Sequence, residues 1–240
     1  MHPRSSEFSR NRERLTGDAA DPYAPEVGSL PESDVSPGEL ETETGTTIVG
    51  LVCEDGVAMA ADQRASLGGR VVSNKNVQKV EEIQPNAALT ISGSVGGAQS
   101  FIRTLRAEAN LFEVRRGEHM SIGALATMAS NLLRGGPFFA VAPLLGGVDD
   151  DGGFVYSLDP SGSSLADNYS AQGSGMMYAL GVLEQEYDDD LSLDEGRQVA
   201  ARAVQSAVER DTASGNGVHL VSITRNEVDI EGYEDFEDVV

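Results

Sequence analysis

The chain has 240 residues, enough for one domain with an appendage, and 40% of them are apolar, enough for a hydrophobic core. Its 39 acidic residues outnumber 17 basic ones, for a formal net charge of −22. Such a surface repels nucleic acids and anionic membranes, so we expect neither as a partner. No apolar run approaches the roughly 20 residues of a membrane-spanning helix, and no hydrophobic segment follows the arginines of residues 1–20. These features predict a cytoplasmic protein.

The acidic excess also predicts a requirement for salt. Few lysines and runs of aspartate are typical of a halophile, in which an acidic, hydrated surface keeps proteins soluble. At about 1 M salt the Debye length is only about 3 Å, so self-repulsion is screened. We expect dissociation or unfolding in dilute buffer, measurable by circular dichroism and light scattering over a KCl series. Full stability at low salt would contradict this expectation.

Residues 1–45 differ in composition from the rest of the chain. They are rich in Pro, Ser, Glu, Asp and Gly and cannot bury much apolar area, so they should be poorly ordered alone. From Thr46 the pattern becomes that of a strand. An Asp-Gly pair at Asp55-Gly56 then predicts a hairpin between two short strands.

The remaining elements follow from residue periodicity. Helices are expected over 98–114, from Ser121 to about 133, over 176–187, and from a capping box at Ser192–Glu195 to near 214. The helix over 176–187 is apolar almost all round, so it should be covered on more than one side. Strands are expected over 46–53, 56–61, 70–73, 77–83, 87–92, 138–148, 153–158, 165–172, 218–224 and 227–230.

The order of these elements indicates the fold class. Strands, two helices, strands, two helices and strands follow one another, without alternating strand–helix–strand units. Two antiparallel sheets flanked by helix pairs satisfy this order, as an α+β four-layer α/β/β/α sandwich. A doubly wound parallel sheet is disfavoured.

No cofactor or metal is expected. The single cysteine, Cys53, lies in an apolar strand and is expected to be buried and inert. The aspartate runs at 149–151 and 188–190 lack the spacing of a calcium loop and are expected to be solvated turns.

Thr46 directly follows Gly45, where the leader-like segment ends. Cleavage of the Gly45–Thr46 bond would expose an N-terminal threonine, which carries a nucleophilic hydroxyl and a basic amine on one residue. The chain has only three histidines, and none lies in a triad motif. The alternative interpretation is an ordinary edge strand that begins with β-branched residues.

Asp62 and Lys79 are candidates for a charged pair near Thr46. Asp62 ends an apolar strand, where a carboxylate needs a partner, and Lys79 lies in an alternating strand pattern. A lysine paired with Asp62 would stay charged and would lower the pKa of an adjacent amine, favouring its neutral, basic form. The alternatives are a strand-end ion pair between Asp62 and Arg64, and a solvated Lys79.

Three further short segments carry polar or glycine residues at the ends of predicted elements. Asp211 and Ser214 would share the last turn of a helix that Gly215 caps, and Asp211 there opposes the helix dipole. Such a local conflict often marks a functional site, although a surface carboxylate explains it equally. Gly93 and Ser174 lie in Gly-Ser segments between a strand and a helix, where a backbone N–H can serve as an oxyanion donor.

Taken together and in this order, these segments resemble the β subunits of the archaeal 20S proteasome, which are N-terminal-nucleophile hydrolases. The resemblance extends from Thr46 to about residue 230. It is carried by GTTIVG from Gly45, AADQR from Ala60, the Lys79 strand, GSGMMYALGVLE from Gly173 and RDTASG from Arg210.

The resemblance implies a threonine endopeptidase with residues 1–45 as a propeptide, removed autocatalytically at Gly45–Thr46, and 46–240 as the catalytic domain. Thr46 would be the nucleophile, Asp62 and Lys79 its charged partners, and the Gly93 N–H part of the oxyanion hole. The polar network around the new amine would consist of Ser174, Asp211 and Ser214. The substrate pocket would be lined by Ala65, Val77, Ile91 and Val95, which predicts cleavage after hydrophobic residues.

The resemblance also implies a homo-heptameric β ring stacked with α-subunit rings, an unfolding ATPase that acts through the α rings, and polypeptide substrates. Three alternatives remain: a threonine peptidase ring of the simpler bacterial type, a non-catalytic structural ring subunit of the same fold, and an acidic binding module. The 45-residue leader and the RDTASG segment argue against the first. Gly45, Thr46, Asp62 and Lys79 argue against the second, and the sequence around Thr46 together with Asp211 argues against the third.

Overall fold

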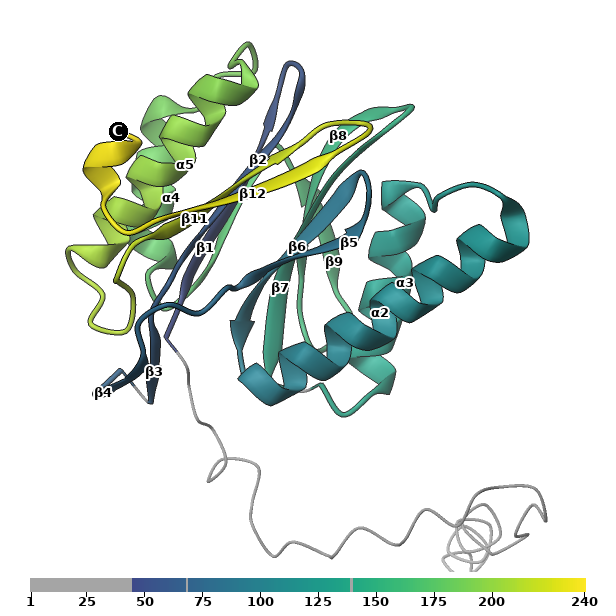
Figure 1. The fold of residues 1–240 in the computed structure, drawn as a ribbon, viewed down its shortest axis with the longest axis horizontal. Coiled ribbons are helices and arrows are strands. Elements are labelled where there is room, and N and C mark those ends of the chain that lie inside the picture. Colours follow the sequence, from purple (N-terminus) through teal and green to yellow (C-terminus); the bar gives the residue numbers. More distant parts are fainter. Residues whose placement is uncertain (1–44, 68, 139) are drawn as a thin grey trace, which may run out of the picture. The chain divides into compact units, whose positions relative to one another are not determined.

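The computed structural model describes residues 45–67, 69–138 and 140–240, so the predicted leader lies outside the described residues except for Gly45. Two five-stranded antiparallel sheets lie face to face, with one pair of helices on the outer side of each (Figure 1). This is the predicted four-layer sandwich. No described helix is long and apolar enough to span a membrane.

The first sheet has the strand order β10-β1-β2-β11-β12. The hairpin predicted at Asp55-Gly56 joins β1 to β2, and the C-terminal hairpin joins β11 to β12. The strand bounds are β1 (Thr47–Cys53), β2 (Gly56–Asp62), β10 (Tyr169–Gly173), β11 (Val218–Ile223) and β12 (Val228–Tyr233).

The second sheet has the order β5-β6-β7-β8-β9, and a separate two-stranded ribbon consists of β3 and β4. The ribbon strands are β3 (Ala65–Leu67) and β4 (Val71–Asn74). The second sheet is made of β5 (Val80–Gln84), β6 (Ala87–Gly93), β7 (Val141–Asp149), β8 (Gly152–Leu158) and β9 (Ser164–Asp167).

Side-chain caps fix where most of the helices begin. Ser94 and Ser121 accept hydrogen bonds from the first turns of α2 and α3, and Ser192 forms the predicted capping box of α5 with Glu195. The helices are α2 (Val95–Arg116), α3 (Ile122–Gly135), α4 (Met176–Glu186) and α5 (Leu193–Val208), and a 3₁₀ turn η2 (Phe236–Asp238) follows β12.

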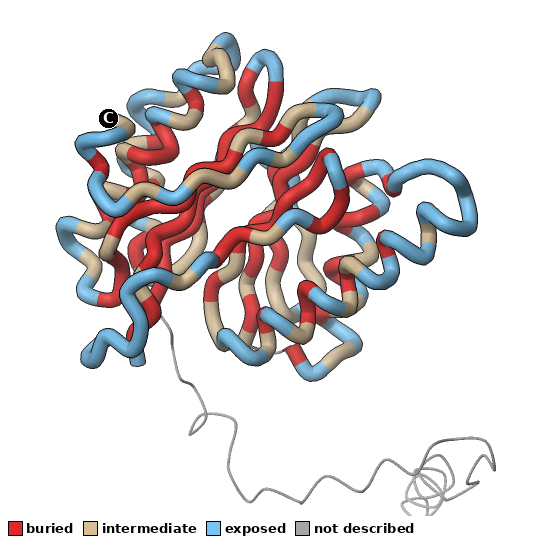
Figure 2. The backbone as a smooth tube through the Cα atoms, viewed as in Figure 1, coloured by how far each residue is buried: buried red, intermediate tan, exposed pale blue. Residues whose placement is uncertain are grey.

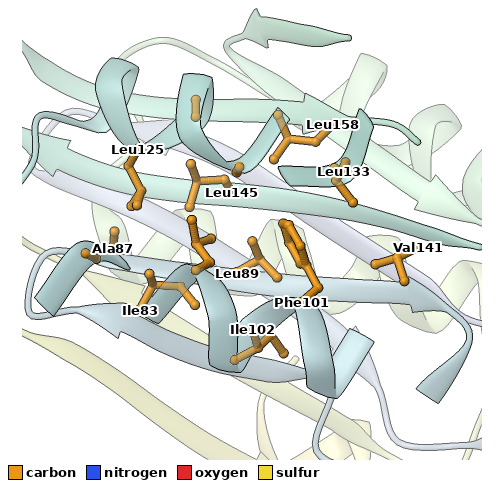
Figure 3. Close-up of a cluster of buried hydrophobic side chains, with 14 of the residues drawn as sticks. Ile83, Ala87, Leu89, Phe101, Ile102, Leu125, Leu133, Val141, Leu145 and Leu158 are labelled. Carbon is orange, nitrogen blue, oxygen red and sulfur yellow. The ribbon is translucent and has the colours of Figure 1, made fainter. Parts of the chain in front are cut away.

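Three hydrophobic cores hold the four layers together, one at each layer boundary. The central strands are therefore buried on both faces (Figure 2). Between the second sheet and α2/α3, Phe101 lies at the middle of a cluster with Leu89 and Leu145 (Figure 3). A second cluster joins the first sheet to α4 and α5, and a third, with Ile48 and Met59, lies between the sheets.

The structure corrects the predicted strand over 165–172. It is two strands in different sheets: β9 pairs with β8 in the second sheet, and β10 pairs with β1 in the first. The chain passes from one sheet to the other at Asn168. Alternating side chains cannot reveal such a crossing, because both halves keep the same two-residue period.

Several predicted boundaries also shift. The strand predicted over 77–83 begins only at Val80, so Lys79 precedes it, and the ribbon strand β3 was not predicted. The helix from Ser192 ends at Val208 rather than near 214. Helix α4 is covered on one side only in the single chain: Ala179 and Leu183 are buried, whereas Met177 is 72% exposed.

Candidate active site

Thr46 lies immediately before β1, at the end of the first sheet where β10 also ends. Its side chain is buried, and its hydroxyl donates a hydrogen bond to the Gly45 carbonyl oxygen at 2.8 Å. The neighbouring Gly173 has φ 95°, and a Cβ there would lie 2.0 Å from the Thr46 carbonyl oxygen. Glycine at 173 thus permits the close approach that holds Thr46 against β10.

Gly45 is equally confined. A Cβ at this position would lie 1.7 Å from Ala213 Cβ and 3.1 Å from Ser174 Oγ. Any side chain at position 45 would therefore displace the loop around Ala213 or shift the carbonyl that the Thr46 hydroxyl contacts. The position predicted as the cleavage junction has room only for glycine.

We expect Gly45→Ala to slow removal of residues 1–45 by about a hundredfold, because a displaced carbonyl no longer lies in line with the Thr46 hydroxyl. Quantitative mass spectrometry of the chain during assembly would measure this rate. Adding Ala213→Gly removes the closest clashing atom and should restore part of the rate. Gly96→Ala is the matched control, since a Cβ at Gly96 meets nothing within 4 Å; equal processing of Gly45→Ala and this control would contradict the prediction.

A polar network surrounds the Thr46 nitrogen. Thr46 N–H donates to Ser174 Oγ at 3.2 Å, and the Ser174 hydroxyl donates to Asp211 Oδ2 at 2.5 Å. The Ser214 hydroxyl donates to the same carboxylate oxygen at 2.6 Å. The Ser214 oxygen also lies 2.8 Å from Thr47 Oγ1. The three residues predicted to act together here are therefore in direct contact.

Asp62 and Lys79 form a buried ion pair, with 2.6 Å between Lys79 Nζ and Asp62 Oδ1. Burial lowers the pKa of the Lys79 ammonium, and the adjacent Asp62 carboxylate opposes that shift. Asp62 also accepts backbone N–H bonds from Thr47 at 2.9 Å, Arg64 at 3.1 Å and Gly215 at 2.9 Å. The carboxylate thus links the lysine to the start of β1 and to the loop after α5.

One predicted position at this site is wrong, and so is one alternative pairing. Asp211 does not lie in the last turn of a helix, because α5 ends at Val208 and Asp211 belongs to the loop that follows it. Arg64 does not pair with the Asp62 carboxylate through its side chain; its guanidinium donates to Asn216 Oδ1 at 2.9 Å and to the Thr212 carbonyl at 3.0 Å. Arg64 thereby fastens the loop that carries Asp211 and Ser214.

A pocket opens beside Thr46 between α2 and the start of the second sheet. All four residues predicted to bind substrate line it, and Gly93 lies in its wall. Gly93 has φ 106°, so glycine is required where β6 gives way to α2. The remaining lining residues include Gln78, Glu81, Ala98, Gln99 and Ile102, which the sequence analysis did not identify.

No histidine takes part in these contacts. His219, on β11, is buried close to the Asp62–Lys79 pair, and its Nδ1 has no hydrogen-bond partner among the described residues. Burial and the Lys79 charge lower its pKa, so it is neutral at pH 7. The Thr46 nitrogen contacts a serine, Ser174, and through it the Asp211 carboxylate, while Lys79 lines the same pocket as Thr46.

Comparison with known proteins gives the family. The family model described as "Proteasome subunit" matches residues 42–223, which is most of the chain. The chain belongs to the proteasome subunit family. A member of this family from Halobacterium salinarum, "Proteasome subunit beta", is 70% identical over 97% of this chain and 96% of its own.

Other relatives agree. "Proteasome subunit beta" of Natrialba magadii is 59% identical over 98% of each chain. "Proteasome subunit beta 2" of Haloterrigena turkmenica is 61% identical over 93% of this chain and 95% of its own. These organisms are halophilic archaea, so the resemblance to haloarchaeal proteasome β subunits is confirmed along with the fold.

Proposed function

We propose that this chain is a catalytic β subunit of the 20S proteasome core particle. In this proposal it is a threonine endopeptidase that first removes its own residues 1–45 and then cleaves unfolded polypeptides. The observation that carries the proposal is the 2.8 Å contact between the Thr46 hydroxyl and the Gly45 carbonyl oxygen. Around this contact lie the hydrogen bonds of Asp211 and the Asp62–Lys79 ion pair, and beside it lies a pocket with several apolar side chains in its lining.

Maturation uses the Gly45–Thr46 bond as the first substrate. Thr46 Oγ attacks the Gly45 carbonyl carbon and loses its proton, and the C–N bond then breaks as the Thr46 nitrogen takes up a proton. The product is an ester between Gly45 and Thr46 Oγ. Water hydrolyses this ester, which frees the leader with a carboxylate at Gly45 and leaves Thr46 with a free α-amine.

Peptide cleavage follows the same route with the new amine as the base. The amine accepts the Thr46 hydroxyl proton, directly or through water, and Thr46 Oγ forms an acyl-enzyme that water then hydrolyses. Ser174, Asp211 and Ser214 orient the amine through the network described above. An α-amino group has an ordinary pKa of about 7.7–8.0, and the Lys79 charge lowers it toward the neutral, basic form. We assign the oxyanion hole to the Gly93 backbone on the basis of its place in the pocket wall.

The pocket supports a preference for cleavage after hydrophobic residues. Ala65, Val77, Ile91 and Val95 present small or medium apolar side chains to it, and Ala98 and Ile102 extend this surface along α2. An apolar side chain that enters would bury its surface against them. Preferred cleavage after Arg or Glu would contradict this assignment.

Assembly is part of the proposal. A homo-heptameric β ring between α rings would enclose Thr46 in a chamber that an unfolding ATPase feeds through the α rings. The single chain exposes large apolar side chains on several elements, among them Val114 on α2 and Met177 and Tyr178 on α4, as a subunit with neighbours would. The names of the relatives, each a proteasome subunit β, point the same way.

The test is the intact mass and N-terminal sequence of the chain purified in high salt within its assembled particle. A chain that begins at Thr46 would support the catalytic assignment. A chain that retains residues 1–45 in the particle would favour the alternative, a non-catalytic structural ring subunit of the same fold. The contact between the Thr46 hydroxyl and the Gly45 carbonyl oxygen favours the catalytic reading, because it places a nucleophile against the bond to be cleaved.

A further inference from the structure

The pocket beside Thr46 contains a carboxylate that an apolar specificity pocket does not need. Glu81, on β5, is one of its lining residues, on the same strand segment that follows Lys79. Across from it, α2 presents Ala98, Gln99 and Ile102 to the same space. Of the two charged side chains that line the pocket, Lys79 is neutralised by Asp62. Glu81 therefore determines the charge that an entering side chain meets.

Arg106 neutralises Glu81 from outside the pocket. It lies one helical turn beyond Ile102, so both project from the same face of α2. Arg106 does not line the pocket itself, but its NH2 group lies 3.1 Å from Glu81 Oε2. Its Nε donates to the Glu82 carbonyl at 2.9 Å, and NH2 contacts the same oxygen. The backbone of β5 thus holds the guanidinium in place beside Glu81, although both side chains of the pair are partly exposed.

We propose that the Glu81–Arg106 ion pair determines the specificity of this pocket by making its charged wall neutral, so that uncharged side chains are accepted and both acidic and basic ones are rejected. This inference rests on the proposed peptidase function. Arg106 acts through Glu81 and is a positioning residue. Without Arg106, the Glu81 carboxylate would attract Lys or Arg side chains of the substrate; without Glu81, the guanidinium would attract Asp or Glu.

The proposal makes opposite predictions for the two halves of the pair. Assembled particles with Arg106→Gln or Glu81→Gln would be assayed in high salt on three fluorogenic peptides that differ only in Tyr, Arg or Glu at the cleaved position. Arg106→Gln should raise the kcat/KM ratio of the Arg peptide to the Tyr peptide by about fivefold, the upper end of the scale for one charge contact at a partly exposed site. Glu81→Gln should raise the ratio of the Glu peptide to the Tyr peptide by about the same factor. The double variant should return both ratios close to those of the unmodified particle.

Arg202→Gln is the matched control. Arg202 on α5 pairs with Glu186 on α4, on the opposite side of the sandwich. The substitution therefore removes a comparable surface ion pair without touching the pocket. Its peptide ratios should not change. If both pocket variants are processed and active but their ratios stay within about twofold of the control, the inference is wrong while the peptidase function stands. If the unmodified particle cleaves none of the three peptides, the proposed function itself fails, and the inference with it.

Discussion

Thr46→Ala is expected to give a folded chain that keeps residues 1–45 and cleaves no peptide. The substitution removes the hydroxyl that contacts the Gly45 carbonyl, so neither the ester of maturation nor the acyl-enzyme of turnover can form. Loss of the nucleophile from a catalytic unit costs on the order of 10⁶ in kcat. The cost to folding is small by comparison, about 1 kcal/mol for one hydrogen bond. Intact mass and a fluorogenic peptide assay on the assembled particle measure both effects.

Thr46→Ser distinguishes the contribution of the hydroxyl from that of the methyl group. Serine keeps Oγ and should retain processing and some turnover, whereas the missing methyl leaves Oγ freer to rotate away from the Gly45 carbonyl. A Thr46→Ala chain produced without residues 1–45 should assemble and stay inactive, which shows that the lost activity does not come from the retained leader. Peptide cleavage by either Thr46→Ala particle would overturn the mechanism.

The fold could be predicted from the sequence because its signals are local. The capping serines, the hairpin at Asp55-Gly56 and the helical periodicity of 98–114 each depend on neighbouring residues, and the structure contains all three. What the sequence could not predict depends on contacts between distant segments. The crossing at Asn168 is such a case, since only the pairing of β9 with β8 and of β10 with β1 separates the two strands.

The candidate site was predictable for a different reason. A carboxylate at the end of a buried strand, as at Asp62, needs a partner, and this need can be read from the sequence. The residues that bind the carboxylate through their backbones cannot be identified so easily. Thr47 and Gly215 donate N–H groups to Asp62, and any residue type could do so. A conflict with a helix dipole points to Asp211 in the sequence, whereas in the structure Asp211 lies in the loop after α5 and accepts hydrogen bonds from Ser174 and Ser214.

The pocket residues also divide into those that the sequence predicts and those that it does not. The family resemblance predicts the four apolar residues. That Glu81 faces residues of α2 depends on how α2 packs on β5, which the sequence does not reveal. Helix α2 begins at Val95, earlier than the periodicity predicted, because Ser94 caps it directly after Gly93. That early start adds Val95 to the helix residues that line the pocket, and Ala98, Ile102 and Arg106 follow at four-residue intervals on one face.

Lys79→Ala is expected to slow both maturation and peptide turnover and to destabilise the chain. The variant leaves the Asp62 carboxylate completely buried with three backbone donors and no cation. Removing one partner of a buried ion pair costs about 3–5 kcal/mol, a large part of the total stability of a typical domain. The effect should persist in high salt, because buried pairs are screened much less than surface pairs. Chemical unfolding in constant salt measures the loss of stability.

The pH dependence separates the catalytic effect of Lys79 from the structural one. In the proposed mechanism the Thr46 amine must be neutral, so kcat/KM rises with pH through the pKa of this amine. The Lys79 charge lowers that pKa, and its removal leaves the negative Asp62 nearby, which raises it further. The rising limb of the pH profile should therefore move to higher pH in Lys79→Ala. Lys75→Ala is the matched control, since Lys75 is exposed and forms no ion pair in the described part of the chain, and its profile should not move. A Lys79→Ala particle whose rate falls at every pH, with the limb in place, would show that Lys79 holds the site together without tuning the amine.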